Sequence, residues 1–178
     1  DMLAQPVARA TRAMLALTVS GKTPWVWGAM RHAWSLGSSV AIVTGDAQSE
    51  AAQLASMVIA PELGADVVAG YINTKAGIAQ KMILSMVTTG LAVRTGRVYS
   101  NLRVDLEASN TKWAERQIAI VMEAGGCSRA EAKAALESCN HNCKTAVLMV
   151  LTGLDAWKAH ELLAQNNGFI RVALQEAP

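Results

Sequence analysis

The six residues Ser39–Thr44, with the sequence SVAIVT, constrain the fold of this chain more than any other stretch. They are rich in β-branched residues and show no alternation between apolar and polar positions. A segment of this kind is typical of a strand that is covered on both faces, as in a parallel sheet with helices on either side. The segment therefore predicts a buried strand of an α/β domain.

The segments around this strand alternate between strand-like and helix-like patterns. Apolar runs at Ala13–Thr18 and Met57–Ala60 predict two further strands, and helices are predicted at 25–36 and 48–55. Pro24 suits the start of a helix, because its ring presets φ and it has no N–H to leave unsatisfied. This alternation predicts βαβ units in a parallel sheet.

Beyond residue 74 the strand signals end and helical patterns follow. Ser128 and Glu131 have the spacing of a capping box, which marks a helix start after the break at Gly125-Gly126. We expect a first domain over 1–124 and a helical tail over 125–178. The predicted helices are 75–95, 110–124, 128–138, 142–152 and 155–165.

One apolar stretch, Ala76–Val93, approaches the length that spans a membrane. It contains Gln80 and Lys81 side by side, which are costly in lipid. The stretch therefore favours a helix buried inside a protein, and we expect no association with a membrane.

Composition excludes several classes of protein. The chain of 178 residues is 52% hydrophobic and carries a formal net charge of only +2, unlike disordered chains. It has no cluster of basic residues, so we expect no nucleic-acid partner. Three cysteines cannot build a disulfide framework, and no basic-then-apolar signal segment opens the chain. A reducing cytoplasm is therefore the expected location.

The loop Thr18–Pro24, with the sequence TVSGKTP, carries the sharpest functional signal. It lies where a predicted strand ends and a helix begins, at the edge of a parallel sheet where α/β folds bind ligands. Hydroxyls, a glycine and a lysine meet at a helix N-terminus, which favours an anion such as phosphate. The alternative is a simple turn at Gly21 with Thr23 as the N-cap of the next helix. The spacing is not that of a P-loop.

Cys139 and Cys143 lie one helical turn apart, with His141 between them. A tetrahedral zinc site needs four ligands, and His141 lies off the face that the two cysteines share. We therefore expect two packed cysteines and no metal site.

A series of stretches then occurs in one order from about residue 13 to residue 172. They are Ser20–Pro24, Lys75–Lys81, Gly96–Asp105, Ser109-Asn110 with Lys112, Gly126–Ser128, Cys139–Ala146 and Gly168–Arg171. Together they resemble the N-acetylmuramic acid 6-phosphate etherase family, whose members carry a sugar-isomerase (SIS) phosphosugar-binding domain.

The resemblance implies a fold and an activity. The fold would be the second half of a three-layer, parallel-sheet SIS domain of flavodoxin-like type, followed by a ubiquitin-associated-like tail of three helices. The activity would be that of a carbon–oxygen lyase without metal or organic cofactor. It would cleave the D-lactyl ether of N-acetylmuramic acid 6-phosphate to N-acetylglucosamine 6-phosphate and D-lactate, a step of amino-sugar catabolism and peptidoglycan recycling. SIS domains commonly pair, so a homodimer is also expected.

The resemblance also implies roles for single residues. Positions expected to hold the phosphosugar are Thr18, Ser20, Gly21, Lys22, Thr23, Asn73 and Lys75. Positions expected to line or support the cleft are Asn101, Asp105 and Asn110.

The chain departs from the family pattern in two ways. The catalytic glutamates and the other glycine-rich sugar loop of the family precede the matched region, and residues 1–12 resemble neither. We therefore expect the chain to need a separate polypeptide that supplies the amino-terminal half. In the stretch Gly70–Thr74, Asn73 stands where the family has an arginine. A neutral amide cannot supply the charge or the bidentate fork of a guanidinium.

Two other functions remain compatible with the loop. One is a non-catalytic phosphosugar-binding regulator, similar in plan to glucokinase regulatory protein. The other is a phosphosugar isomerase.

Overall fold

The computed structural model describes residues 13–68 and 73–177. It divides into two compact units, Asp1–Met86 and Val87–Pro178. Gly70, Tyr71 and Ile72, which belong to the predicted departure from the family pattern, lie outside the described residues.

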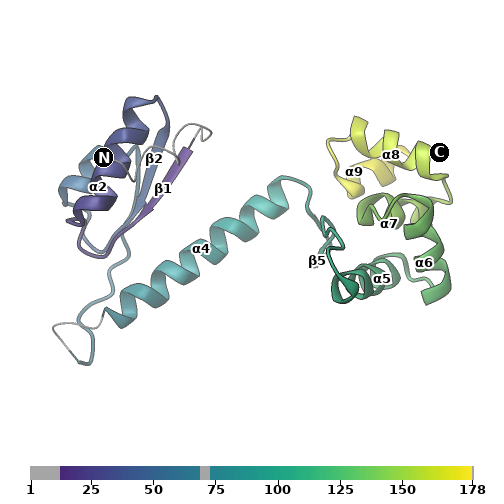
Figure 1. Ribbon diagram of the computed structural model, residues 1–178, viewed down its shortest axis with the longest axis horizontal. Coiled ribbons are helices and arrows are strands. Elements are labelled where there is room, and N and C mark those ends of the chain that lie inside the picture. Colours follow the sequence, from purple (N-terminus) through teal and green to yellow (C-terminus); the bar gives the residue numbers. More distant parts are fainter. Residues whose placement is uncertain (1–12, 69–72, 178) are drawn as a thin grey trace. The chain divides into compact units, whose positions relative to one another are not determined.

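The first unit contains a parallel three-stranded sheet with β2 (Ser39–Val43) in the middle. Its neighbours are β1 (Ala13–Leu17) and β3 (Met57–Ile59). The strands are connected through α2 (Pro24–Ser35) and α3 (Glu50–Leu54). This arrangement confirms the predicted α/β alternation and the parallel sheet (Figure 1).

The core of the first unit lies between the sheet and α2. Ile42 and Met30 are fully buried, and Val40 and Ala33 are 2% exposed. These side chains alternate along β2 and recur at helical spacing along α2, so each element presents one apolar face to the other. This packing fixes α2, and with it the loop that precedes the helix.

The long helix α4 (Thr74–Arg94) is much more exposed than the sequence predicts. Ile83 is its only buried residue among those described, whereas Ile78, Met82 and Met86 are each 58–61% exposed. The expectation of a buried helix is therefore wrong for the described part of the chain, because few of its residues pack along α4. By length and composition α4 is the one described helix that could cross a membrane, and 6% of its apolar window is buried. A single helix of this kind is weak evidence for a span.

The second unit is helical apart from one short hairpin. The antiparallel strands β4 (Val98–Tyr99) and β5 (Leu102–Arg103) are absent from the sequence prediction, which ended the strands at residue 74. Two residues per strand are too few to show a periodic pattern. The turn places Ser100 at a positive φ of 54°.

The helices of this unit pack around a shared apolar core. They are α5 (Thr111–Gly125), α6 (Arg129–Ser138), α7 (Cys143–Thr152), α8 (Ala156–Gln165) and α9 (Ile170–Glu176). Val121, Val147 and Leu148 are fully buried at its centre. The sequence predicts the first four helices and misses α9. Helix α5 packs on α6 and α7 within this unit. The expected domain boundary at 124/125 stays a prediction.

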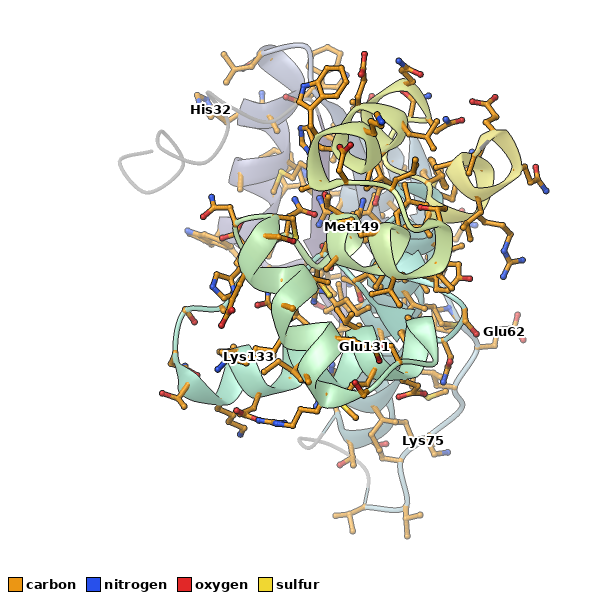
Figure 2. The ribbon with its side chains drawn as sticks, turned by 90° about the vertical axis from the view of Figure 1, so that its right-hand side faces the viewer. His32, Glu62, Lys75, Glu131, Lys133 and Met149 are labelled. Atoms are coloured by element: carbon orange, nitrogen blue, oxygen red, sulfur yellow. The ribbon has the colours of Figure 1, made fainter. Side chains whose placement is uncertain are left out.

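Two local expectations in this unit are confirmed. The capping box at the start of α6 is present: the Ser128 hydroxyl accepts from the Glu131 N–H, and the Glu131 carboxylate accepts from the Ser128 N–H at 2.7 Å. Glu131 is labelled on this helix in Figure 2. The packing of both cysteines is the second: Cys143 lies in the core at 2% exposure, and Cys139 packs against this core while partly buried. Burial raises the pKa of the Cys143 thiol to about 12.

Candidate functional site

The loops that follow β1 and β2 lie side by side. The two strands are parallel neighbours with Leu17 opposite Val43, so their carboxyl ends meet at one edge of the sheet. The Val19 carbonyl accepts a hydrogen bond from the Gly45 N–H at 2.9 Å, which ties the first loop to the second. This edge is where parallel α/β sheets bind ligands.

Gly21 brings the first loop against the start of α3. Its φ is +67°, a left-handed conformation that residues with a Cβ rarely adopt. A Cβ at this position would also overlap the side chain of Ser49, the N-cap of α3. Both the backbone conformation and the close approach therefore require glycine here.

The hydroxyl groups of the loop organise its backbone. Thr18 is 5% exposed, and its Oγ1 lies 3.0 Å from Thr23 Oγ1 and accepts from the Gly21 N–H at 3.2 Å. The Ser20 hydroxyl accepts from the Lys22 N–H, also at 3.2 Å. These bonds hold the loop in a tight turn, with the side chains of Ser20, Lys22 and Thr23 exposed.

The N-terminus of α2 lacks a side-chain cap. Thr23 occupies the N-cap position but bonds to Thr18 instead, and Pro24 follows as the first helical residue. The first N–H groups of a helix need a partner that the helix cannot supply. Thr23 is thus the N-cap residue, as the alternative expects, but its side chain makes no capping hydrogen bond, which leaves a helix start of the kind that favours an anion.

A pocket of about 360 Å³ opens beside this loop. Gly21, Lys22 and Pro24 form one side of it, and Trp27 and Glu50 complete the lining. The guanidinium of Arg31 lies 4.7 Å from the centre of the Trp27 ring, which fixes the indole at the mouth of the loop. The volume lies near the lower end for small-molecule sites.

Hydrogen bonds of Lys75 and Asp66 connect the start of α4 to the segment that precedes it. The Lys75 ammonium donates to the carbonyls of Ala65, at 2.5 Å, and Leu63, at 3.3 Å. The Asp66 carboxylate accepts from the N–H groups of Thr74 and Lys75 at 3.1 and 3.0 Å, which caps the helix. The ammonium of Lys75, labelled in Figure 2, thus binds carbonyls of the segment before α4. Its expected role beside a sugar stays a prediction. Asn73 is exposed immediately before α4.

The remaining expected residues lie in the second unit. Asn101 and Asp105 line a pocket of about 790 Å³ that also includes Arg103, Trp113 and Arg116. Asn110 is the N-cap of α5, with its side chain accepting from the Trp113 N–H at 3.1 Å.

Asp105 is held by two arginines. Its carboxylate lies 2.7 Å from the Arg103 Nε and 3.6 Å from the Arg97 Nε. Burial by itself raises the pKa of Asp105, but the hydrogen bond and charge of Arg103, together with the charge of Arg97, outweigh it and lower the pKa. The carboxylate therefore stays ionised at neutral pH, as a support for the hairpin that forms one wall of the pocket.

The structure thus gathers five of the expected residues, Thr18, Ser20, Gly21, Lys22 and Thr23, into one loop. Two residues escape prediction from the sequence: Glu50, which completes the pocket, and Asp66, which caps α4. Neither position has a local sequence signal, because each is brought to its place by packing between loops.

No family model matches the chain. The chain is 52% identical over 161 residues to the N-acetylmuramic acid 6-phosphate etherase of Klebsiella aerogenes, covering 90% of this chain and 54% of that protein. The etherase of Aliivibrio fischeri (strain MJ11) is 50% identical over 163 residues, or 92% of this chain and 54% of the relative. That of Photorhabdus laumondii is 48% identical over 158 residues, or 89% and 52%.

The chain spans about half the length of the curated relatives that it matches. Within that span the identity is near 50%. The comparisons therefore confirm the resemblance found in the sequence: over about nine-tenths of its length, this chain is similar to N-acetylmuramic acid 6-phosphate etherases.

Proposed function

We propose that the chain binds a phosphorylated amino sugar as part of an etherase-type carbon–oxygen lyase. The substrate would be N-acetylmuramic acid 6-phosphate, and the products N-acetylglucosamine 6-phosphate and D-lactate. The observation that carries this proposal is the identity of 52% over 161 residues with a relative named for that activity. The uncapped start of α2 beside the loop Thr18–Pro24 supports the phosphate part of the proposal independently.

The loop supplies the groups that a phosphate ester requires. The hydroxyls of Ser20 and Thr23 and the ammonium of Lys22 are exposed hydrogen-bond donors around one helix start. The helix dipole and free N–H groups add partial positive charge at the same point. A phosphoryl group bound there would have its ester oxygen directed to the adjoining pocket, where the sugar would lie.

The reaction itself is an elimination followed by addition of water. A general base removes the proton from the sugar carbon next to the ether carbon, and the ether C–O bond breaks as a carbon–carbon double bond forms. A general acid protonates the departing lactate oxygen, and water then adds across the double bond. The chain's own part in this scheme is to bind and orient the phosphosugar, and the acid and base would come from the part of the etherases that this chain does not match.

The proposed fold is the carboxyl half of an SIS domain over 1–124 with a ubiquitin-associated-like tail over 125–178. The proposed assembly contains two copies of the chain and works in the cytoplasm. Exposed apolar side chains on α4, including Ile78, Met82 and Met86, support an assembly that covers this helix. Three free cysteines support a reducing compartment.

The test measures D-lactate release from N-acetylmuramic acid 6-phosphate. The chain is mixed with the part of the Klebsiella aerogenes etherase that it does not match, and each polypeptide alone is the control. We expect lactate from the mixture, and none when Ser20 and Thr23 are both replaced by alanine. If no lactate forms while the sugar phosphate still raises the melting temperature of the chain, the lyase proposal fails and a non-catalytic regulator is favoured.

A further inference from the structure

Glu50 lines the pocket beside the loop Thr18–Pro24, and the proposed function gives it no role. It is the first residue of α3, and it lines the pocket together with Gly21 and Lys22. It directly follows the loop after β2, whereas Lys22 belongs to the loop after β1.

The backbone that carries Glu50 is fixed by Ser49. The Ser49 side chain is 4% exposed, donates to the Asp46 carbonyl at 2.8 Å and accepts from the Ala52 N–H at 3.3 Å. Gly21 approaches the Ser49 side chain closely, so the start of α3 packs against the loop Thr18–Pro24. The backbone of Glu50 therefore starts from a set position relative to any anion that the loop binds, and its side chain is exposed at the pocket.

The chemistry of Glu50 is opposite to that of the loop. Hydroxyls, an ammonium and helix N–H groups all donate hydrogen bonds, whereas an ionised carboxylate only accepts them. The dianion of a simple ester such as propyl phosphate is also an anionic acceptor with no N–H or O–H, so Glu50 repels it and has no hydrogen bond to accept from it. A phosphate ester with hydroxyl or amide N–H groups on its organic part gives the carboxylate a donor to bind.

We propose that Glu50 is a specificity-determining residue, which accepts a hydrogen bond from a hydroxyl or amide N–H of the phosphosugar and disfavours phosphate esters that lack such a donor. This inference rests on the proposed binding of a phosphosugar at the loop Thr18–Pro24. It adds a second recognition element: the first loop binds the phosphoryl group and Glu50 selects what is attached to it.

The simpler role of an acidic residue in a first helical turn is to stabilise the helix N-terminus. That role predicts no dependence on the ligand, because a change in helix stability affects all ligands of the loop alike. Specificity predicts a loss of affinity for the sugar phosphate and no loss for propyl phosphate, so binding measurements separate the two roles.

The experiment is isothermal titration of the full chain with inorganic phosphate, propyl phosphate and N-acetylglucosamine 6-phosphate. The variants are Glu50→Gln, which removes the charge and keeps an acceptor, and Glu50→Ala, which removes both. The control variant is Glu62→Gln, which removes an exposed glutamate of the same unit that does not line the pocket. Melting curves by circular dichroism check that each variant is folded.

We expect Glu50→Ala to weaken binding of the sugar phosphate on the order of tenfold, and Glu50→Gln to weaken it less. Both should leave the affinity for propyl phosphate, whose dianion has no donor for the carboxylate, unchanged or raise it, because a negative charge is removed. Glu62→Gln should change none of the three.

Equal changes for all three ligands, or no change for the sugar phosphate, would overturn the role of Glu50. In those outcomes the wild-type chain still binds phosphate esters, so the proposed function stands. If the wild-type chain binds none of the three ligands, the proposed function and the role of Glu50 both fail.

Discussion

Replacing Gly21 by alanine should destabilise the first unit and impair anion binding, for two separable reasons. The φ of +67° costs a residue with a Cβ about 1–2 kcal/mol. The overlap of the new Cβ with the Ser49 side chain adds about 1–3 kcal/mol, as overpacking in a fixed environment does. We therefore expect the free energy of unfolding of this unit to fall by about 3 kcal/mol.

Two other glycines of the same unit provide matched controls. Gly37 has a φ of +75° and nothing within 4 Å of an added Cβ, so Gly37→Ala tests the backbone cost alone, about 1–2 kcal/mol. Gly28 lies within α2 with open space around it and no positive φ, so Gly28→Ala should stabilise by about 0.5–1 kcal/mol. The three variants together separate the backbone conformation from the contact with Ser49.

The assay is native-state hydrogen exchange of the β2 amides, which reports the opening free energy of the sheet without interference from the helical unit. Titration with inorganic phosphate measures the effect on the loop in the same samples. Equal destabilisation by Gly21→Ala and Gly37→Ala would refute the role of the Ser49 contact. Unchanged phosphate affinity in Gly21→Ala would refute the dependence of the site on that contact.

Three further predictions concern capping and titration. Asp66→Ala removes the cap of α4 and should lower its stability by about 1 kcal/mol, seen as faster amide exchange at Thr74 and Lys75. The pKa of Asp105 is lowered in the folded chain, so its stabilising effect should be present above the ordinary carboxyl pKa of about 4 and lost as pH falls through the folded value. Asp105→Asn should remove that part of the acid dependence in urea titrations, and an unchanged pH profile would contradict it. Cys143, with a pKa raised to about 12, should be alkylated by iodoacetamide at pH 8 far more slowly than Cys139, as peptide mass spectrometry would show.

Patterns confined to one segment predict the local elements of this chain well. The strands β1, β2 and β3 follow from short apolar runs, β-branched in β2 and β3, and α5 and α6 follow from helical patterns, with Ser128 as the cap of α6. The loop Thr18–Pro24 is found because its hydroxyls, glycine and lysine are consecutive. In each case the determining interactions lie within a few residues of one another.

Features that depend on contacts between residues distant in the sequence could not be predicted from it. Glu50 reaches the pocket because Gly21 touches Ser49, and Asp66 caps a helix that begins eight residues later. The exposure of α4 is a further example. Its apolar composition predicts a helix that packs against other elements, but composition does not identify those elements. The short strands β4 and β5 carry too few residues for any pattern.

The most direct test of the central claim is to follow the backbone amide resonances of the chain while it is titrated with N-acetylglucosamine 6-phosphate. The account predicts that the largest shifts occur at Ser20, Gly21, Trp25 and Val26, with a smaller effect at Glu50, and that they disappear when Ser20 and Thr23 are replaced by alanine. Shifts confined to other parts of the chain, or no saturable shifts at all, would contradict a phosphosugar site at the loop Thr18–Pro24.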